Sequence, residues 1–164
     1  MIYRIQGNSG GSASNASDKN NFRIGVVTAR FNIEVTKNLE IGALQFLEKE
    51  QVSKIFAVRV AGAVEIPLAA KILLEQGCDG VVALGAVIRG DTAHFDYVCN
   101  SVERGCTELQ LSHGKPVGFG VLTTENEEQA LDRAGGRLGN KGEEAAAVVL
   151  EMLHLIKEIR NIPI

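Results

Sequence analysis

Short apolar runs alternate along this chain with longer segments whose apolar residues recur at helical spacing, and this alternation constrains the fold most. The apolar runs cover residues 22–29, 55–60, 80–87 and 116–123, and the helical segments cover residues 34–50, 66–76, 92–112, 127–134 and 140–160. Strands that are apolar on both faces and alternate with helices are typical of a parallel sheet with helices on both sides. The sequence therefore predicts an α/β fold in three layers around a central parallel sheet.

Ligands bind to such sheets beyond the carboxyl ends of the strands. Four loops follow the predicted strands, and they cover residues 29–33, 61–67, 88–94 and 123–127. We expect the functional side chains of this protein to come mainly from these four loops.

The first 21 residues differ in character from the rest of the chain. Residues 2–5 form a short alternating segment that favours a strand, and residues 7–21 are rich in Gly, Ser and Asn. The second stretch has almost no side chain to bury, so it is typical of a flexible linker or loop. A lone strand ahead of such a linker must return to its own sheet or add to the sheet of another chain. The predicted organisation is an N-terminal strand and linker over residues 1–21 and one domain over residues 22–164.

The composition excludes several classes of function. The chain has 164 residues, enough for one domain, and a formal net charge of -3 without a long run of Lys or Arg. A nucleic-acid-binding protein normally shows a basic face, so we expect no nucleic-acid partner, whereas an anionic small molecule needs only a few local cations. No apolar run approaches the length of a membrane span, and neither the Cys nor the His residues have metal-ligand spacing. We expect a cytoplasmic protein with buried, inert thiols and with neither a membrane partner nor a bound metal.

The segment from Gly85 to Asp96 carries the strongest functional signal. It leaves a predicted strand and enters a predicted helix, with Gly90 and Thr92 at the junction. Backbone N–H groups at such a junction, with the helix dipole behind them, form an anion site, although Thr92 alone could be explained as a helix cap. His94 falls in the first helical turn, where the dipole disfavours protonation, so it could accept a proton in a reaction. A surface histidine or a secondary cap is the alternative interpretation of His94.

Two more strand-to-helix turns carry candidate binding residues. Phe31 follows the first predicted strand of the domain, where it would either cap the core or stack on a planar ligand, and the residue alone favours the core. In the next turn, Gly62 permits close backbone approach, and Glu65 would either bind hydroxyl groups or stabilise a helix N-terminus. A Gly-rich segment over residues 133–142 carries three cations but lacks the Walker spacing, and the chain has no dinucleotide-binding fingerprint. Nucleotide cofactors are therefore not predicted.

Taken together, these segments resemble the 6,7-dimethyl-8-ribityllumazine synthase family, and they follow in the family's order. The segments that carry the resemblance are Arg30-Phe31-Asn32, Gly62-Ala63 with Glu65-Ile66-Pro67, Ile88-Arg89-Gly90-Asp91-Thr92 with His94-Phe95-Asp96, Phe119-Gly120-Val121-Leu122-Thr123, and Arg133-Ala134-Gly135 with Gly139-Asn140-Lys141-Gly142. Five such motifs in register over residues 21–160 are very specific. The resemblance implies a flavodoxin-like three-layer sandwich that assembles into pentamers, and in some members into a hollow icosahedral shell of twelve pentamers.

The resemblance also implies an activity. The implied reaction condenses 5-amino-6-(D-ribitylamino)uracil with 3,4-dihydroxy-2-butanone 4-phosphate to 6,7-dimethyl-8-ribityllumazine, phosphate and water, the penultimate step of riboflavin biosynthesis. No cofactor and no metal are expected. The implied partners are these small molecules, further copies of the chain with active sites between subunits, and riboflavin synthase. In the family, a strand such as that at residues 2–5 adds to the sheet of a neighbouring subunit.

The resemblance assigns roles to individual positions. His94 would transfer the proton, and Phe31 would stack on the pyrimidine ring. The other assigned residues would bind substrate. Ala63, Val64 and Glu65 would lie on the ribityl side, and Ala86, Val87 and Ile88 beside the pyrimidine. Asp91 and Thr92 would bind the phosphate, Phe119 and Arg133 would come from the neighbouring subunit, and Lys141 would line the same site.

Two other functions are compatible with this fold class. A non-catalytic relative could keep the fold only for its shell, but such a scaffold would not need Phe31, Glu65, His94 and Arg133 together. A flavodoxin-like flavin-binding module should carry a hydroxyl- and Gly-rich phosphate loop after the first strand, whereas residues 29–32 are Ala, Arg, Phe and Asn. We therefore predict the enzyme, with the shell-forming protein as the alternative.

Overall fold

A computed structural model describes residues 21–163 of the chain. The strand predicted at residues 2–5 lies outside the described residues, and so does the linker predicted at residues 7–21 apart from Asn21. The division into a segment over residues 1–21 and a domain over residues 22–164 thus stays a prediction.

Four parallel strands form the central sheet, in the order β2-β1-β3-β4. They are β1 (Arg23–Ala29), β2 (Lys54–Val60), β3 (Gly80–Ile88) and β4 (Val117–Thr124). β1 pairs with β2 along its whole length but with β3 only as far as Thr28 and Leu84, whereas β3 and β4 stay paired up to Ile88 and Thr124. The carboxyl end of β3 therefore extends beyond β1. The order matches the first four strands of a flavodoxin-like sheet, as predicted.

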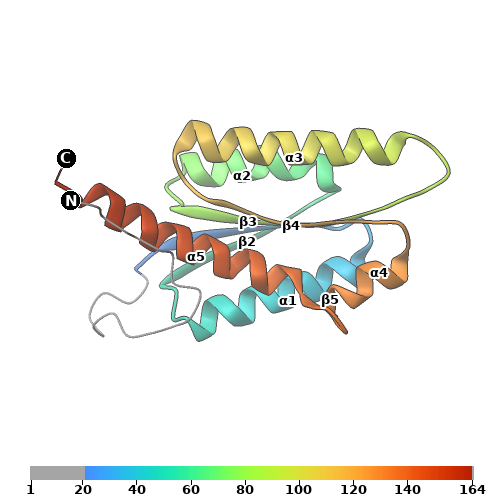
Figure 1. Cartoon of the computed structure of the whole chain (residues 1–164), viewed down its shortest axis with the longest axis horizontal. Helices are drawn as coiled ribbons and strands as arrows, with labels where there is room; N and C mark the ends of the chain where they lie inside the picture. The colour runs from blue at the N-terminus through green and yellow to red at the C-terminus, as the bar shows by residue number, and fades with distance from the viewer. Residues whose placement is uncertain (1–20, 164) are drawn as a thin grey trace.

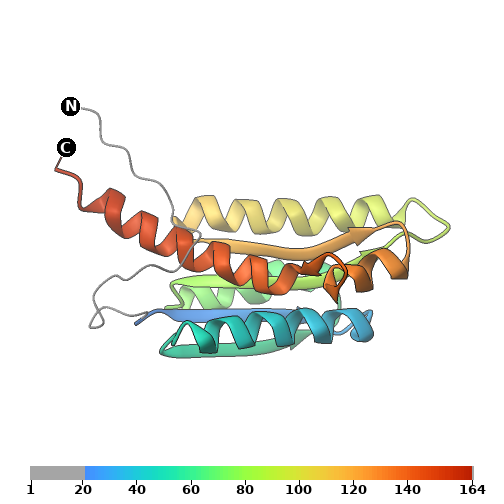
Figure 2. The same cartoon turned by 60° about the horizontal axis from the view of Figure 1, so that its bottom comes forward.

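Helices cover both faces of the sheet, as Figures 1 and 2 show. One face carries α1 (Ile33–Lys49), α4 (Glu127–Asp132) and α5 (Lys141–Arg160), and the other carries α2 (Ile66–Glu75) and α3 (His94–His113). A separate group of buried apolar side chains fills each interface. Val82 of β3 belongs to one group and its neighbour Val81 to the other, because successive side chains of a strand point to opposite faces. The predicted three-layer α/β architecture is confirmed.

The ends of the elements differ slightly from the predicted ones. Each strand and helix predicted within residues 22–160 is present, with its ends shifted by at most two residues. The structure adds a 3-10 turn, η1 (Ala63–Glu65), and a hairpin of β5 (Ala134–Gly136) and β6 (Gly139–Asn140), none of which was predicted. Thr92 is not the cap residue of α3, because Ala93 occupies that position without a side-chain cap bond. The Thr92 hydroxyl instead accepts the backbone N–H of His94 at 3.4 Å.

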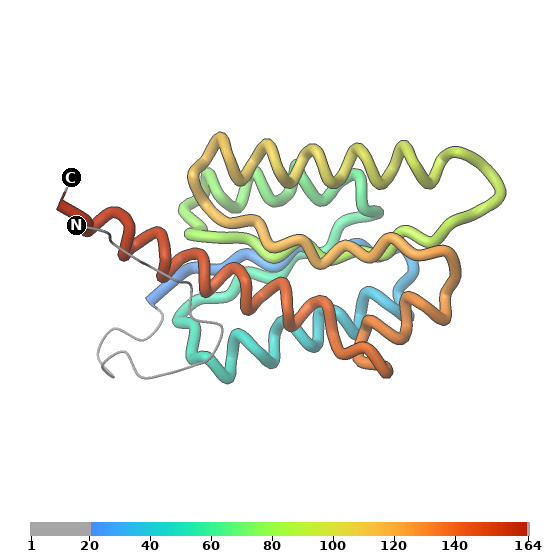
Figure 3. The backbone as a smooth tube through the Cα atoms, in the orientation of Figure 1, coloured from blue at the N-terminus to red at the C-terminus, as the bar shows by residue number. Residues whose placement is uncertain are grey.

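The loops that follow the four strands lie at one end of the molecule, together with the first turns of α1, α3 and α4 (Figure 1). Figure 3 shows that the loop between β3 and α3 projects farthest at this end. The start of α5 lies close against α1, since a Cβ on Gly142 would be 2.0 Å from the backbone oxygen of Leu39. Only glycine fits this contact. The packing of the two helices thus places the β5–β6 hairpin, which precedes α5, at the same end as the loops.

Candidate functional site

The carboxyl end of β3 offers an open row of backbone groups. Because β1 stops pairing at Leu84, residues 85–88 bond to β4 on one side and have no strand partner on the other within residues 21–163. Asn32 partly fills this gap, since its side-chain N–H donates to the backbone oxygen of Ala86 at 2.8 Å. The remaining N–H and C=O groups require partners, and a planar heterocycle can supply them. The gap lies between β1 and β3, the switch point of the sheet where ligands bind in such folds.

Phe31 directly precedes Asn32 and does not belong to the core. Its exposed fraction is 72%, so the interpretation of Phe31 as a core residue is wrong. Asn32 adopts a left-handed conformation with φ of 58°, which turns the chain into α1. The backbone N–H of Phe31 donates to the oxygen of Ala61 at 3.1 Å, which joins the loops after β1 and β2. An exposed aromatic ring on a backbone held in this way is available to stack on a planar ligand.

The turn η1 follows β2 and contains three of the predicted binding residues. Ala63 is buried, whereas Val64 and Glu65 are exposed. The carboxylate of Glu65 accepts the backbone N–H of Gly62 at 2.8 Å, which is the stabilising role given as the alternative for this residue. That bond uses one carboxylate oxygen, and the other can still accept a hydroxyl group. The role of Glu65 toward a ligand stays a prediction.

The N-terminus of α3 is open to an anion. The backbone N–H groups of residues 90–93 form no hydrogen bond within residues 21–163, and Asp91 and Thr92 are both exposed. The helix has 20 residues, so its dipole adds to the field of these N–H groups. His94 is exposed in the first turn, and its ring has no hydrogen-bond partner in the described part of the chain. The imidazole is therefore free to exchange a proton with a ligand bound at the same helix end.

A hollow of about 230 Å³ lies along β4, and we call it the β4 hollow. Phe119, Arg133 and Lys141 are among the residues that line it. The β5–β6 hairpin brings the two cations together, because the backbone N–H of Lys141 donates to the oxygen of Arg133 at 2.9 Å. Lys141 forms an ion pair with Glu144. The guanidinium of Arg133 donates to the backbone oxygen of Gln129 at 2.9 Å and forms no ion pair within the described residues.

The third cation of the Gly-rich segment is neutralised. Arg137 bonds to the carboxylate of Asp132, and this bond lowers the pKa of the Asp132 carboxyl group and raises the pKa of Arg137. Arg133 is thus the cation of the hairpin whose charge is available to an anion. This arrangement favours Arg133 as the predicted phosphate-binding side chain.

A second hollow, of about 350 Å³, lies at the loop after β1 and is lined in part by Phe31 and Glu127. Neither hollow is lined by both Phe31 and Arg133, since β3 separates β1 from β4 in the sheet. Glu65 and His94 line neither of the two. Phe119, Arg133 and Lys141 thus line one hollow of the chain, and Phe31, Glu65 and His94 do not line it.

Other classes of site find little support in the described residues. No group of three or more His, Cys, Asp or Glu side chains within residues 21–163 is arranged to hold a metal ion. No helix in that range combines the length and the apolar character that a membrane span requires. Cys78 and Cys106 are buried, and burial raises the pKa of both thiols, that of Cys106 to about 12. Cys99 is half-buried, so the prediction of three buried thiols is wrong for this residue, although desolvation raises its pKa as well.

Comparison with known proteins identifies the family. The family model described as 6,7-dimethyl-8-ribityllumazine synthase matches residues 21–157. This chain belongs to that family. A protein named 6,7-dimethyl-8-ribityllumazine synthase from Bdellovibrio bacteriovorus is 66% identical over 137 residues, which cover 84% of this chain and 76% of that protein. A protein of the same name from Desulfovibrio desulfuricans is 45% identical over 145 residues, which cover 87% of this chain and 93% of that protein.

The family predicted from the five motifs is confirmed, whereas the roles of single residues toward a ligand stay predictions. Two residues that shape the site of this lumazine synthase family member stand in the quoted motifs, but sequence reasoning gave them no role. Asn32 joins the loop after β1 to β3, and its residue type was the available signal, since Asn tolerates a left-handed backbone. Arg89 bonds to Glu125, which lies 36 residues away, so the partner could not be recognised without the topology.

Proposed function

We infer that this chain is an enzyme, a transferase that condenses 5-amino-6-(D-ribitylamino)uracil with 3,4-dihydroxy-2-butanone 4-phosphate to give 6,7-dimethyl-8-ribityllumazine in riboflavin biosynthesis. Membership of the lumazine synthase family supports this activity. The observation that carries it in the structure is the N-terminus of α3, where unbonded backbone N–H groups adjoin the exposed imidazole of His94. An anion site beside a proton-transfer group is what the elimination of phosphate requires.

The two substrates have distinct places in this proposal. The pyrimidine lies against residues 85–88, where backbone groups on the β1 side have no strand partner among residues 21–163, and Phe31 stacks on its ring. The ribityl chain extends toward η1, where Ala63, Val64 and Glu65 border it. The phosphate of the butanone lies at the start of α3, close to the N–H groups of Asp91 and Thr92.

The chemistry needs orientation and proton transfer from the protein. The 5-amino group adds to the ketone carbonyl, and loss of water gives an imine. Removal of a proton from the adjacent carbon then expels inorganic phosphate, and the resulting enol becomes a ketone. The ribitylamino nitrogen closes the ring on that ketone with loss of a second water. His94 accepts and returns the protons of these steps. The site also holds the two reactants in contact, so their reaction proceeds as within one molecule and does not depend on a chance encounter in solution.

We further propose that the site is completed by a second copy of the chain. The β4 hollow offers the cation of Arg133 and the ring of Phe119, and His94 is not among the residues that line it. Apolar side chains are also exposed on α2 and α3, where the exposed fraction is 67% for Leu68 and 76% for Leu111. Exposed apolar side chains of this kind fit a contact between subunits.

The proposal also covers the location of the protein, its assembly and its protein partner. We propose a cytoplasmic homopentamer, assembly of twelve pentamers into an icosahedral shell, and riboflavin synthase as a partner. Three cysteines that form no disulfide are compatible with a reducing compartment. The mass of the purified protein in solution distinguishes a pentamer from a shell of 60 subunits.

The activity is tested by mixing the purified protein with both substrates. We expect the absorbance and fluorescence of the lumazine to appear with one phosphate released for each lumazine formed. Reactions without protein and reactions that lack one substrate give the background. If the assembled protein does not raise product formation above that background, the proposed activity is wrong.

A further inference from the structure

The loop over residues 89–93, which we call the entry loop, leads from β3 into α3 and begins with Arg89. We propose that Arg89 is a positioning residue: it fixes both ends of the entry loop, so that the backbone N–H groups of the loop meet the phosphate, and it does not bind the phosphate itself. The inference rests on the proposed function, since it names the residue that shapes the phosphate site.

Arg89 contacts both neighbours of the loop. Its Nε donates to Oε2 of Glu125, in the loop after β4, at 2.8 Å. Its guanidinium also lies 3.6 Å from the carboxylate of Asp96 and 4.2 Å from the centre of the Phe95 ring, both in the first turn of α3. The backbone N–H of Arg89 donates to the oxygen of Thr124 at 2.9 Å. One side chain thus joins the end of β3, the loop after β4 and the start of α3.

The rest of the entry loop has little to hold it. The N–H groups of residues 90–93 form no hydrogen bond within the described residues, and a Cβ on Gly90 would meet nothing within 4 Å. An open loop of this kind gains conformational freedom when its ends are released, and a ligand must then order it again. The bond from the His94 N–H to the Thr92 hydroxyl is local, whereas the contacts of Arg89 join the loop to its neighbours and favour one arrangement of these N–H groups.

The surroundings of Arg89 disfavour a direct role in phosphate binding. Two carboxylates already neutralise its charge, and the hydrogen bond with Glu125 raises the pKa of Arg89, so the side chain stays a paired cation. A phosphate at the guanidinium would also lie close to Glu125 and Asp96, and like charges repel. Arg133 forms no ion pair with a carboxylate within residues 21–163 and is the better phosphate ligand.

The two roles predict opposite effects of one substitution. If Arg89 positions the loop, Arg89→Gln and Glu125→Gln should each raise the KM for the butanone phosphate by about two- to fivefold, because both release the same end of the loop. The double variant should be no worse than the single ones, since the residues act through one contact. If Arg89 bound the phosphate, Glu125→Gln would free its guanidinium and lower that KM. A lower KM in Glu125→Gln, or additive effects in the double variant, would overturn the proposal.

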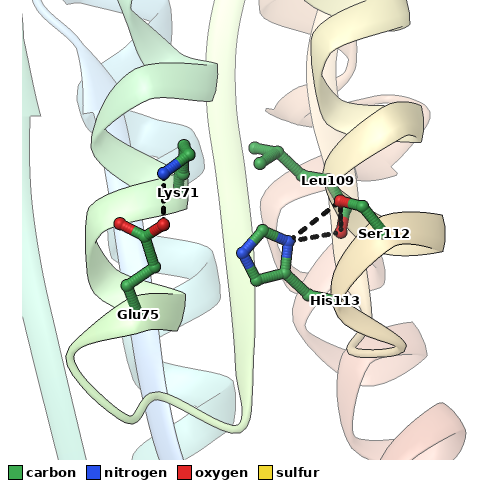
Figure 4. A network of polar contacts seen from close by, with 5 residues as sticks. All are labelled: Lys71, Glu75, Leu109, Ser112 and His113. Carbon is green, nitrogen blue, oxygen red and sulfur yellow. Dashed lines mark hydrogen bonds and ion pairs between the residues drawn. The ribbon is translucent and has the colours of Figure 1, made fainter.

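Further measurements separate positioning from a general loss of structure. Arg89→Lys keeps the charge and should recover part of the loss, and the KM for the pyrimidine should stay within about twofold in all variants. Glu75→Gln is the matched control, because Glu75 is an exposed carboxylate paired with Lys71 on α2, near His113 at the last turn of α3 (Figure 4). This control should leave both KM values unchanged. A rise in both KM values together in the Arg89 variants would show a merely structural role.

Binding of inorganic phosphate, measured by calorimetry, tests the loop without turnover. We expect Arg89→Gln and Glu125→Gln to weaken it by a factor similar to that in KM, with Glu75→Gln unchanged. A wild-type protein that makes no lumazine would refute the proposed function but would leave this comparison valid. Equal phosphate affinity in wild type and variants, or no phosphate binding by the wild type, would refute the role of Arg89.

Discussion

Replacing Phe31 with Ala distinguishes a stacking residue from a core residue by its cost in stability. The side chain is 72% exposed, so little more than a quarter of it is removed from water on folding. A Phe side chain that is fully buried covers about 150–250 Å², so this fraction corresponds to roughly 50 Å² and, at about 25 cal/mol per Å², to about 1 kcal/mol. A core Phe replaced by Ala costs about 3–5 kcal/mol instead.

Thermal melting and pyrimidine titration together test this reasoning. For a domain of this length, about 1 kcal/mol lowers the melting temperature by roughly 2–4 °C. We expect Phe31→Ala to stay within that range while its affinity for the pyrimidine falls about two- to tenfold, as the loss of one ring contact predicts. Phe56→Ala is the control, because Phe56 lies on the edge strand β2 and is 37% exposed. It should destabilise more and leave the affinity unchanged. A fall of roughly 10 °C in Phe31→Ala with unchanged affinity would refute the stacking role.

Three further substitutions or reactions test other parts of the account. His94→Ala should slow turnover about 10²- to 10⁴-fold at saturating substrate, and a variant as fast as wild type would remove His94 from the mechanism. Gly142→Ala should cost about 1–3 kcal/mol or more in thermal unfolding, because its Cβ would lie 2.0 Å from the Leu39 oxygen; an unchanged melting temperature would contradict this contact. Burial raises the pKa of Cys106 from 9.0 to about 12, so at pH 8 the native thiol stays protonated and should resist alkylation until the protein unfolds. Rapid labelling of Cys106 in the native protein, located by peptide mass, would contradict its burial.

Much of the fold could be predicted from the sequence because its signals are local and repeated. Runs such as residues 80–87 are apolar at every position, which is typical of a strand buried on both faces, and the helical segments show a clear period. The β5–β6 hairpin could not be found in this way. Its Gly-rich sequence has no apolar period, and the antiparallel pairing of Ala134 with Asn140 and of Gly136 with Gly139 defines it.

The sequence indicates which residues belong to the candidate site, but it does not show how exposed they are or what they contact. The residue type of Phe31 indicates an aromatic at the end of a strand, but only the folded chain shows that the side chain is exposed and lies beside the left-handed turn at Asn32. The residue type of Glu65 indicates a carboxylate in a turn, but its bond to Gly62 depends on the path of the chain through η1. Contacts between distant loops, such as Arg89 with Glu125, follow from the strand order and therefore need the folded chain.

We propose that His94 of one chain and Arg133 of another complete one site, and exchange of subunits between two variants tests this most directly. Chains that carry His94→Ala and chains that carry Arg133→Ala are prepared separately, each with little activity, and then mixed under conditions that exchange subunits. Such mixing forms some contacts in which an intact His94 faces an intact Arg133, so the account predicts that lumazine formation partly returns. Mass spectrometry of the mixed assemblies verifies the exchange. If verified exchange restores no activity, the site lies within one chain and the shared-site account is contradicted.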